Sequence, residues 1–76
     1  MLTAAQVRGA RAMIEMKQQD LADAAGITRS VLAAFEAGQS ASRSSTLERI
    51  RGVLEARGIA FIESEAGTGV LLKSGS

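Results

Sequence analysis

The sequence contains no cysteine and no histidine among its 76 residues. Their absence excludes disulfide bonds, thiolate chemistry, zinc fingers and every catalytic mechanism that relies on histidine as a general base. Proline, tyrosine and tryptophan are missing as well, and the only aromatic residues are Phe35 and Phe61. Since alanine is abundant, we expect a hydrophobic core built mainly from small aliphatic side chains.

The sequence also has almost equal numbers of positive and negative side chains. Nine Lys and Arg residues against eight Asp and Glu residues give a net charge of +1, so DNA binding would have to rest on the local placement of charge. No apolar run approaches the ~18–20 residues that cross a bilayer. No apolar run follows a basic start at the N-terminus. We therefore expect no membrane contact, no signal peptide and a cytoplasmic location.

The chain is long enough for one small domain. Domains typically contain ~100–150 residues, so two separate cores would not fit here. An apolar content of 46% is ordinary for a folded domain. A domain of this size is marginally stable alone and gains from pairing with a partner.

Four segments carry the signals of helices. Apolar residues recur at helical spacing within each segment, and glycines that can adopt positive φ follow three of them, at Gly26, Gly38 and Gly58. Thr3–Gln6 and Ser45–Glu48 fit the capping-box pattern. The helices are predicted over residues 3–15, 18–25, 28–36 and 45–57.

After Gly58 the hydrophobic period changes to that of strands. Residues 59–62 and 70–73 are short apolar runs, and residues 63–69 between them are rich in turn formers. The pattern predicts a β-hairpin over residues 59–73, packed against a helical bundle over residues 1–58 because an isolated hairpin is marginal in water. Residues 74–76 are expected to be a frayed tail.

The second and third predicted helices form the most informative unit. A short connection that contains Gly26 and the good N-cap Thr28 joins them. Two short helices joined by a glycine-containing turn are the helix-turn-helix pattern. The helices share one apolar set, which consists of Leu21, Ala22, Ala25, Ile27, Leu32 and Phe35.

Over residues 3–57 the sequence resembles the phage repressor and Cro class of helix-turn-helix proteins, often called the Xre family. The features that agree are Gln18 at the opening of the second helix, Leu21-Ala22, Gly26, Leu32 and the exit Glu36-x-Gly38. The resemblance implies a compact, mainly α, lambda-repressor-like bundle whose third helix enters the major groove of double-stranded DNA. It also implies a buried ion pair between Arg11 and Glu36.

The resemblance points to a set of DNA contacts. Residues at the N-terminus of a recognition helix reach base edges, and here these are Arg29 and Ser30. Arg29 can bind guanine through two hydrogen bonds, and Val31 either touches a thymine methyl group or is partly buried. Ala34 stands where the family often has a polar base-reading side chain, so readout rests on few residues and on DNA shape. Contacts with the DNA backbone are implied for Lys17, Gln18, Thr28, Gln39, Ser42 and Arg43.

The predicted hairpin carries more apolar side chains than a two-stranded sheet can bury alone. We expect these side chains, with the outer face of the fourth helix, to form a two-fold dimer interface that also pairs edge strands. The alternative is a hairpin that packs only on its own bundle. The predicted dimer residues are Ile59, Phe61, Ile62, Val70, Leu71 and Leu72.

Two other classes of function are weighed against a dimeric repressor. An enzyme is not expected, because Ser44 and Ser45 have no base nearby in sequence and Gly67-Thr68-Gly69 is a turn rather than a phosphate-binding loop. No cofactor and no metal site are expected. The remaining alternative is an antitoxin or similar regulator whose main partner is a toxin or another protein.

Overall fold

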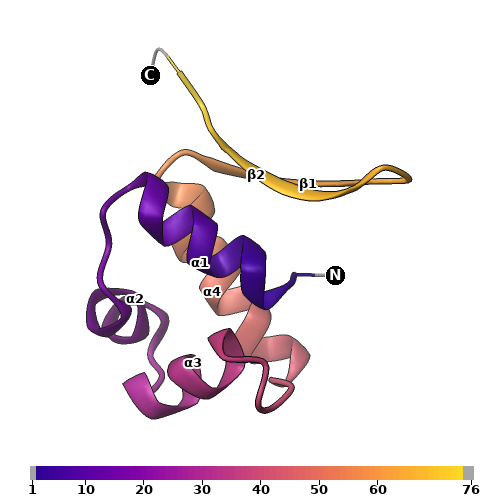
Figure 1. The fold of residues 1–76 in the computed structure, drawn as a ribbon. Coiled ribbons are helices and arrows are strands. Elements are labelled where there is room, and N and C mark those ends of the chain that lie inside the picture. Colours follow the sequence, from indigo (N-terminus) through magenta and orange to yellow (C-terminus); the bar gives the residue numbers. More distant parts are fainter. Residues whose placement is uncertain (1, 75–76) are drawn as a thin grey trace.

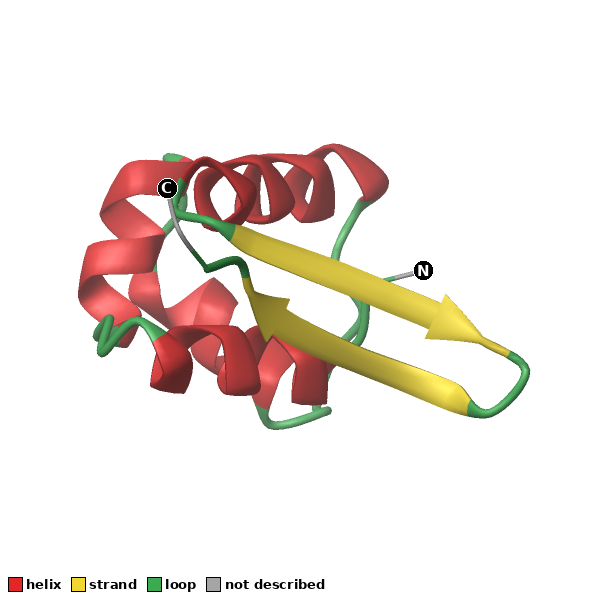
Figure 2. Cartoon of the chain, turned by 90° about the horizontal axis from the view of Figure 1, so that it is seen from above, coloured by secondary structure: helices red, strands yellow, loops and turns green. Residues whose placement is uncertain are grey.

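The computed structural model describes residues 2–74, in which four helices precede a two-stranded antiparallel sheet (Figure 1). The helices pack together, and the hairpin lies across α1 and α4 at one end of the molecule (Figures 1 and 2). This arrangement confirms the mainly α fold with a C-terminal hairpin. The elements are α1 (Ala4–Met13), α2 (Gln18–Ala25), α3 (Arg29–Glu36), α4 (Ser44–Ala56), β1 (Ile59–Ser64) and β2 (Gly67–Leu72).

The start of α1 is fixed by the predicted capping box. The Thr3 hydroxyl accepts from the Gln6 backbone N–H at 3.1 Å, and the Gln6 side-chain oxygen accepts from the Thr3 N–H at 2.9 Å. The helix is shorter than the predicted 3–15: Thr3 is the cap rather than a helical residue. The helix ends at Met13, because Glu15 takes a left-handed φ of 53° and turns the chain toward α2.

The capping box predicted at residues 45–48 is wrong. Helix α4 begins at Ser44, and its N-cap is Arg43, whose side chain makes no capping hydrogen bond. A capping side chain has to sit on extended backbone just outside the helix, so Ser45 inside the first turn cannot serve. The helix also ends one residue earlier than predicted, at Ala56.

The core lies between the helices and under the start of the hairpin. Its fully buried members come from every helix and from β1, which makes bundle and hairpin one packed unit. None of α1–α4 has the length and apolar character of a membrane span. The largest fully buried side chains are Leu21, Leu32, Ile50, Leu54, Ile59 and Val7.

The hairpin is longer in its strands and tighter in its turn than predicted. Glu63 pairs with Thr68 and Ser64 pairs with Gly67, so only two residues are left to form the turn. The expectation of a turn-rich bridge over residues 63–69 is therefore wrong. Backbone hydrogen bonds of the ladder do not depend on side-chain polarity, and the residues at this end of the strands are exposed.

One face of the hairpin packs against α1 and the other faces solvent. The Gln6 side-chain N–H₂ donates to the carbonyl oxygens of Ile62 at 3.2 Å and Gly69 at 2.9 Å, which joins α1 to both strands. Gly9 allows close approach, since a Cβ there would lie 3.3 Å from Cγ2 of Val70. The predicted tail falls partly outside the described residues, since 75 and 76 are not among them.

Candidate nucleic-acid interface

The turn between α2 and α3 has the geometry that a helix-turn-helix needs. Gly26 ends α2 with φ 72°, a left-handed conformation that glycine adopts at little cost, and the Ile27 N–H donates to the Ala22 carbonyl at 3.0 Å. The Thr28 hydroxyl then accepts from the Val31 N–H at 3.2 Å and caps α3. The predicted cap and turn are confirmed. Helix α3 lies at the end of the molecule opposite the hairpin (Figure 1).

The first turn of α3 presents its side chains to solvent. Arg29 and Ser30 are exposed, and Val31 keeps 45% of its surface accessible although it is apolar. Leu32 and Phe35 on the opposite side of the helix are buried in the core. The helix is therefore anchored by its inner face, and its N-terminal outer face is free for contacts.

Several predicted contact residues meet around one recess of about 430 Å³. It lies between α3, the loop that follows it and the first turn of α4. Arg43 is its only charged lining residue, and no carboxylate lines it. The lining residues are Ser30, Val31, Ala34, Ser40, Ala41, Ser42, Arg43 and Thr46.

The other predicted contact residues do not line this recess. Gln39 is an exposed loop residue beyond α3. Lys17 is the N-cap of α2, where its backbone N–H donates to the Asp20 carboxylate at 3.4 Å. Thr28 is exposed at the N-cap of α3. These residues lie at helix ends and in a loop, as the resemblance implies for backbone contacts.

A buried carboxylate at the end of α3 ties this helix to α1 and α2. Glu36 is 2% exposed, and its two oxygens accept from Arg11 at 2.6 and 2.8 Å. The structure thus contains the ion pair that the resemblance implies. The Gln18 side-chain N–H₂ also donates to Glu36, at 3.1 Å, so this amide joins α2 to α3.

Sequence reasoning missed one member of this group. The Arg8 guanidinium donates to the backbone carbonyl of Glu36. The available signal was its position one turn before Arg11 on α1, which puts both guanidinium groups on the same side of the helix. Two arginines of α1 therefore hold the C-terminal end of the candidate recognition helix.

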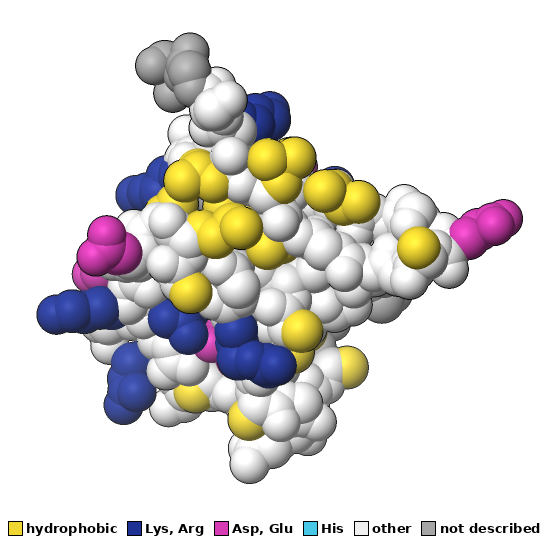
Figure 3. Space-filling view, turned by 45° about the horizontal axis from the view of Figure 1, so that its top comes forward, with side chains coloured by type: hydrophobic (Ala, Val, Ile, Leu, Met, Phe, Trp, Pro, Cys, Tyr) yellow, Lys and Arg dark blue, Asp and Glu magenta, His cyan; other side chains and the backbone are white. Residues whose placement is uncertain are grey.

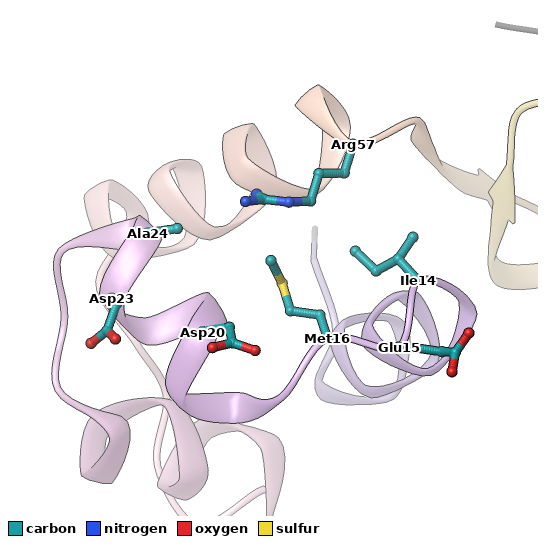
Figure 4. Close-up of a pocket in the computed structure, with 7 residues that line it drawn as sticks. All are labelled: Ile14, Glu15, Met16, Asp20, Asp23, Ala24 and Arg57. Atoms are coloured by element: carbon teal, nitrogen blue, oxygen red, sulfur yellow. The ribbon is translucent and has the colours of Figure 1, made fainter.

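A second hollow, of about 580 Å³, has the opposite electrostatic character (Figure 4). Met16 extends into it from the α1–α2 connection, and Arg57 reaches across from the end of α4 (Figure 4). Three carboxylates line it, from Glu15, Asp20 and Asp23. Negative side chains repel phosphates, so this larger hollow is less suited to DNA than the recess beside α3. Among residues 2–74, no three side chains that can ligate a metal are grouped to hold one.

The residues predicted to mediate dimerisation divide into two groups. Ile59 is 1% exposed and belongs to the chain's own core. Phe61 and Val70 are half-buried and pack against that core. Ile62, Leu71 and Leu72 are 41–45% exposed. Figure 3 shows hydrophobic side chains gathered toward the hairpin end, with Lys and Arg side chains lying below them.

Comparison with known proteins agrees with this geometry. A family model described as helix-turn-helix matches residues 7–60, which span most of α1, all of α2, α3 and α4, and the start of β1. No curated protein matches the chain. Since the match covers well over half of the sequence and includes the capped turn and α3, the chain belongs to the helix-turn-helix family of Xre and phage-repressor-like DNA-binding regulators.

Proposed function

We propose that this chain is a sequence-specific transcriptional repressor that inserts α3 into the major groove of its operator. The observation that carries the proposal is the free first turn of α3 beside a recess without carboxylates. A major groove admits one α-helix, and its edges differ for each base pair. Arg29 is an exposed residue of that turn, and in this proposal it binds guanine through O6 and N7.

Contacts with the DNA backbone fix the register of α3 in the groove. Arg43 and Ser42 line the recess, and Lys17 and Gln18 lie at the start of α2, where the positive end of the helix dipole favours an anion. Thr28 and Gln39 complete the set at the two ends of α3. Such contacts supply affinity without reading sequence.

We further propose that the bundle over residues 1–58 binds DNA and that the hairpin over residues 59–73 mediates a homodimer. The hairpin and α3 lie at opposite ends of the molecule (Figure 1). Packing two hairpins face to face would point the two recognition helices in opposite directions. Pairing their edge strands instead keeps both helices on one side, as two half-sites about 34–36 Å apart require. A dimer on its operator blocks polymerase by occupying the DNA, in the cytoplasm.

The DNA-binding proposal is tested with wild type and two arginine variants on DNA from the region upstream of the gene. Arg29→Ala is expected to lose roughly 1–3 kcal/mol on the operator and little on random DNA. Arg57→Ala is the matched control, because Arg57 lies at the acidic hollow, and it should bind as wild type does. Equal losses for both variants would contradict the assignment of α3.

The dimer is tested by sedimentation equilibrium. Wild type is expected to be a dimer at tens of micromolar, and Leu71→Glu or Ile62→Glu should shift it toward the monomer. The variant with the larger effect identifies the strand closer to the two-fold axis. A monomeric wild type would contradict the dimer and favour the alternative in which a toxin or another protein adds a strand to the free edge of the hairpin.

A further inference from the structure

Arg49 lies within α4, outside the segments that carry the proposed DNA contacts. Its side chain is exposed, and its guanidinium group lies beside the turn that precedes α3. A Cβ atom added to Gly26, the glycine of that turn, would lie 3.6 Å from Nη1 of Arg49. The middle of α4 therefore places a positive charge next to the N-terminal end of the candidate recognition helix.

The contacts of Arg49 differ from those of the next arginine on the same helix. Arg51 pairs with Glu55 at 3.0 Å, and its guanidinium carbon lies 5.3 Å from the centre of the Phe61 ring. Over residues 2–74, the Arg49 side chain forms neither an ion pair nor a hydrogen bond. Its N–H donors are therefore available to a ligand, whereas Arg51 already has contacts within the chain.

Arg49 also continues a row of side chains that begins at the recess beside α3. Arg43 and Thr46 line this recess, and Arg49 follows Thr46 after three positions. Residues at this spacing are neighbours on the surface of a helix, so Arg49 lies one turn further along α4. The row formed by Arg43, Thr46 and Arg49 therefore runs beside α3 toward the turn at Gly26.

We propose that Arg49 binds a phosphate of the DNA strand that borders the major groove on the α4 side of α3. The inference rests on the proposed function and adds a cationic contact from a helix outside the helix-turn-helix unit. A groove about 12 Å wide is nearly filled by a helix about 10–12 Å across, so side chains beside α3 meet the sugar-phosphate backbone.

The spacing of the two arginines in the row allows each to bind its own phosphate. Arg43 and Arg49 are six positions apart, which corresponds to about 9 Å along a helix axis. Phosphates of one strand recur about every 3.4 Å along the duplex axis. The row can therefore follow one strand over more than one nucleotide, and it supplies affinity without reading sequence.

The first experiment measures how DNA binding by Arg49→Gln depends on salt. This variant removes the charge, so the slope of log K against log salt should become less steep by about 1. Between about 50 and about 200 mM salt, the ratio of wild-type to variant affinity should fall about 3.5-fold. Operator and random DNA should lose affinity equally. Arg49→Lys keeps the charge and should keep the wild-type slope.

Arg51→Gln is the matched control. It removes a charge two positions along the same helix, where the side chain points in another direction and pairs with Glu55. Its slope should equal that of wild type. A thermal melt of each variant confirms that it is folded at the temperature of the binding measurement.

A second experiment locates the phosphate on an operator selected by wild-type protein from random duplexes. Each phosphate is replaced singly by an uncharged methylphosphonate, and binding is measured by fluorescence anisotropy. At one phosphate the replacement should weaken wild type and leave Arg49→Gln unaffected. A different phosphate of the same strand should give this result for Arg43→Ala.

Three results would overturn the inference. If Arg49→Gln keeps the wild-type slope, Arg49 binds no phosphate. If no methylphosphonate position depends on Arg49, the charge acts only at a distance. If Arg49→Gln loses affinity for the operator alone, Arg49 reads a base instead. A wild-type protein that selects no sequence refutes the proposed function, whereas a selected operator with an unchanged slope in Arg49→Gln refutes this inference alone.

Discussion

At the scale of single residues, Glu36 is the buried charged group around which the polar contacts between helices are arranged. Its buried carboxylate accepts hydrogen bonds from Arg11 on α1 and Gln18 on α2, while it belongs to α3 itself. Three helices therefore meet at one charged group. A buried carboxylate is tolerated only when it is paired and hydrogen-bonded, and here both conditions hold.

Arg11→Ala is expected to destabilise the protein by about 3–5 kcal/mol, because it leaves a buried charge without its partner. The free energy of unfolding is measured by urea denaturation. Glu55→Gln is the control: it removes the Arg51–Glu55 pair, whose side chains are 40% and 47% exposed, and it should cost less than about 0.5 kcal/mol. Losses of similar size in both variants would mean that Glu36 is not held by Arg11.

At the scale of elements, α1 connects the two ends of the molecule. Arg8 and Arg11 bind the end of α3. Gln6 and Gly9, on the same helix, contact the hairpin. The orientation of the hairpin relative to the recognition helix thus depends in part on this helix of ten residues. The spacing of two half-sites in a hairpin-mediated dimer follows from this helix.

Gln6→Ala tests this connection. It removes the two hydrogen bonds to the strands and half of the capping box, and we expect a loss of roughly 1–3 kcal/mol. Thr3→Ala removes the capping side chain alone and should cost about 1 kcal/mol. Thermal or urea unfolding compares the two variants. An equal cost would indicate that the contacts between Gln6 and the hairpin add no stability.

How far sequence reasoning succeeded differs from element to element. The turn from α2 to α3 was predictable because Gly26 and Thr28 are local signals with local effects. The exact bounds of the strands were not predictable. Glu63 and Thr68 pair because the backbone ladder formed by the apolar residues continues to them. Ser45 looked like a cap, but α4 begins at Ser44, so Ser45 lies inside its first turn.

The same distinction applies to the candidate site. The exposed turn at Arg29 could be predicted from helical spacing, and the Arg11–Glu36 pair from the family resemblance. The recess could not be predicted, because it forms where Ala34 of α3 approaches Ser42 and Thr46 across a loop. The two roles of Gln6 were also out of reach, since its second set of partners lies 56 and 63 positions away.

At the scale of the whole molecule, charge is distributed unevenly despite a net value of +1. The recess at α3 carries Arg43 without a carboxylate, and the hollow between α2 and α4 carries three carboxylates. One face is therefore suited to DNA and another is not. Because only Lys17, Arg43 and Arg49 among the proposed backbone contacts are cationic, the affinity for DNA should fall only gradually as salt is raised.

Arg43→Ala should reduce the slope of log K against log salt by about 1, and it should weaken operator and random DNA to the same extent. A salt titration of binding to both duplexes measures the slope and the selectivity together. Arg57→Ala, on the acidic side, should leave the slope unchanged. A loss confined to the operator would show that Arg43 reads sequence instead of binding phosphate.

The hydrogen bonds from Gln6 to the hairpin also bear on how the chain folds. They join residues that are 56 and 63 positions apart in the sequence. The hydrogen bonds within a helix join residues that are only a few positions apart. Contacts of long separation cost more loop-closure entropy and tend to form late. The helices can therefore assemble first and the hairpin dock last. We therefore expect the hairpin to open and exchange its amide hydrogens more readily than the helices do.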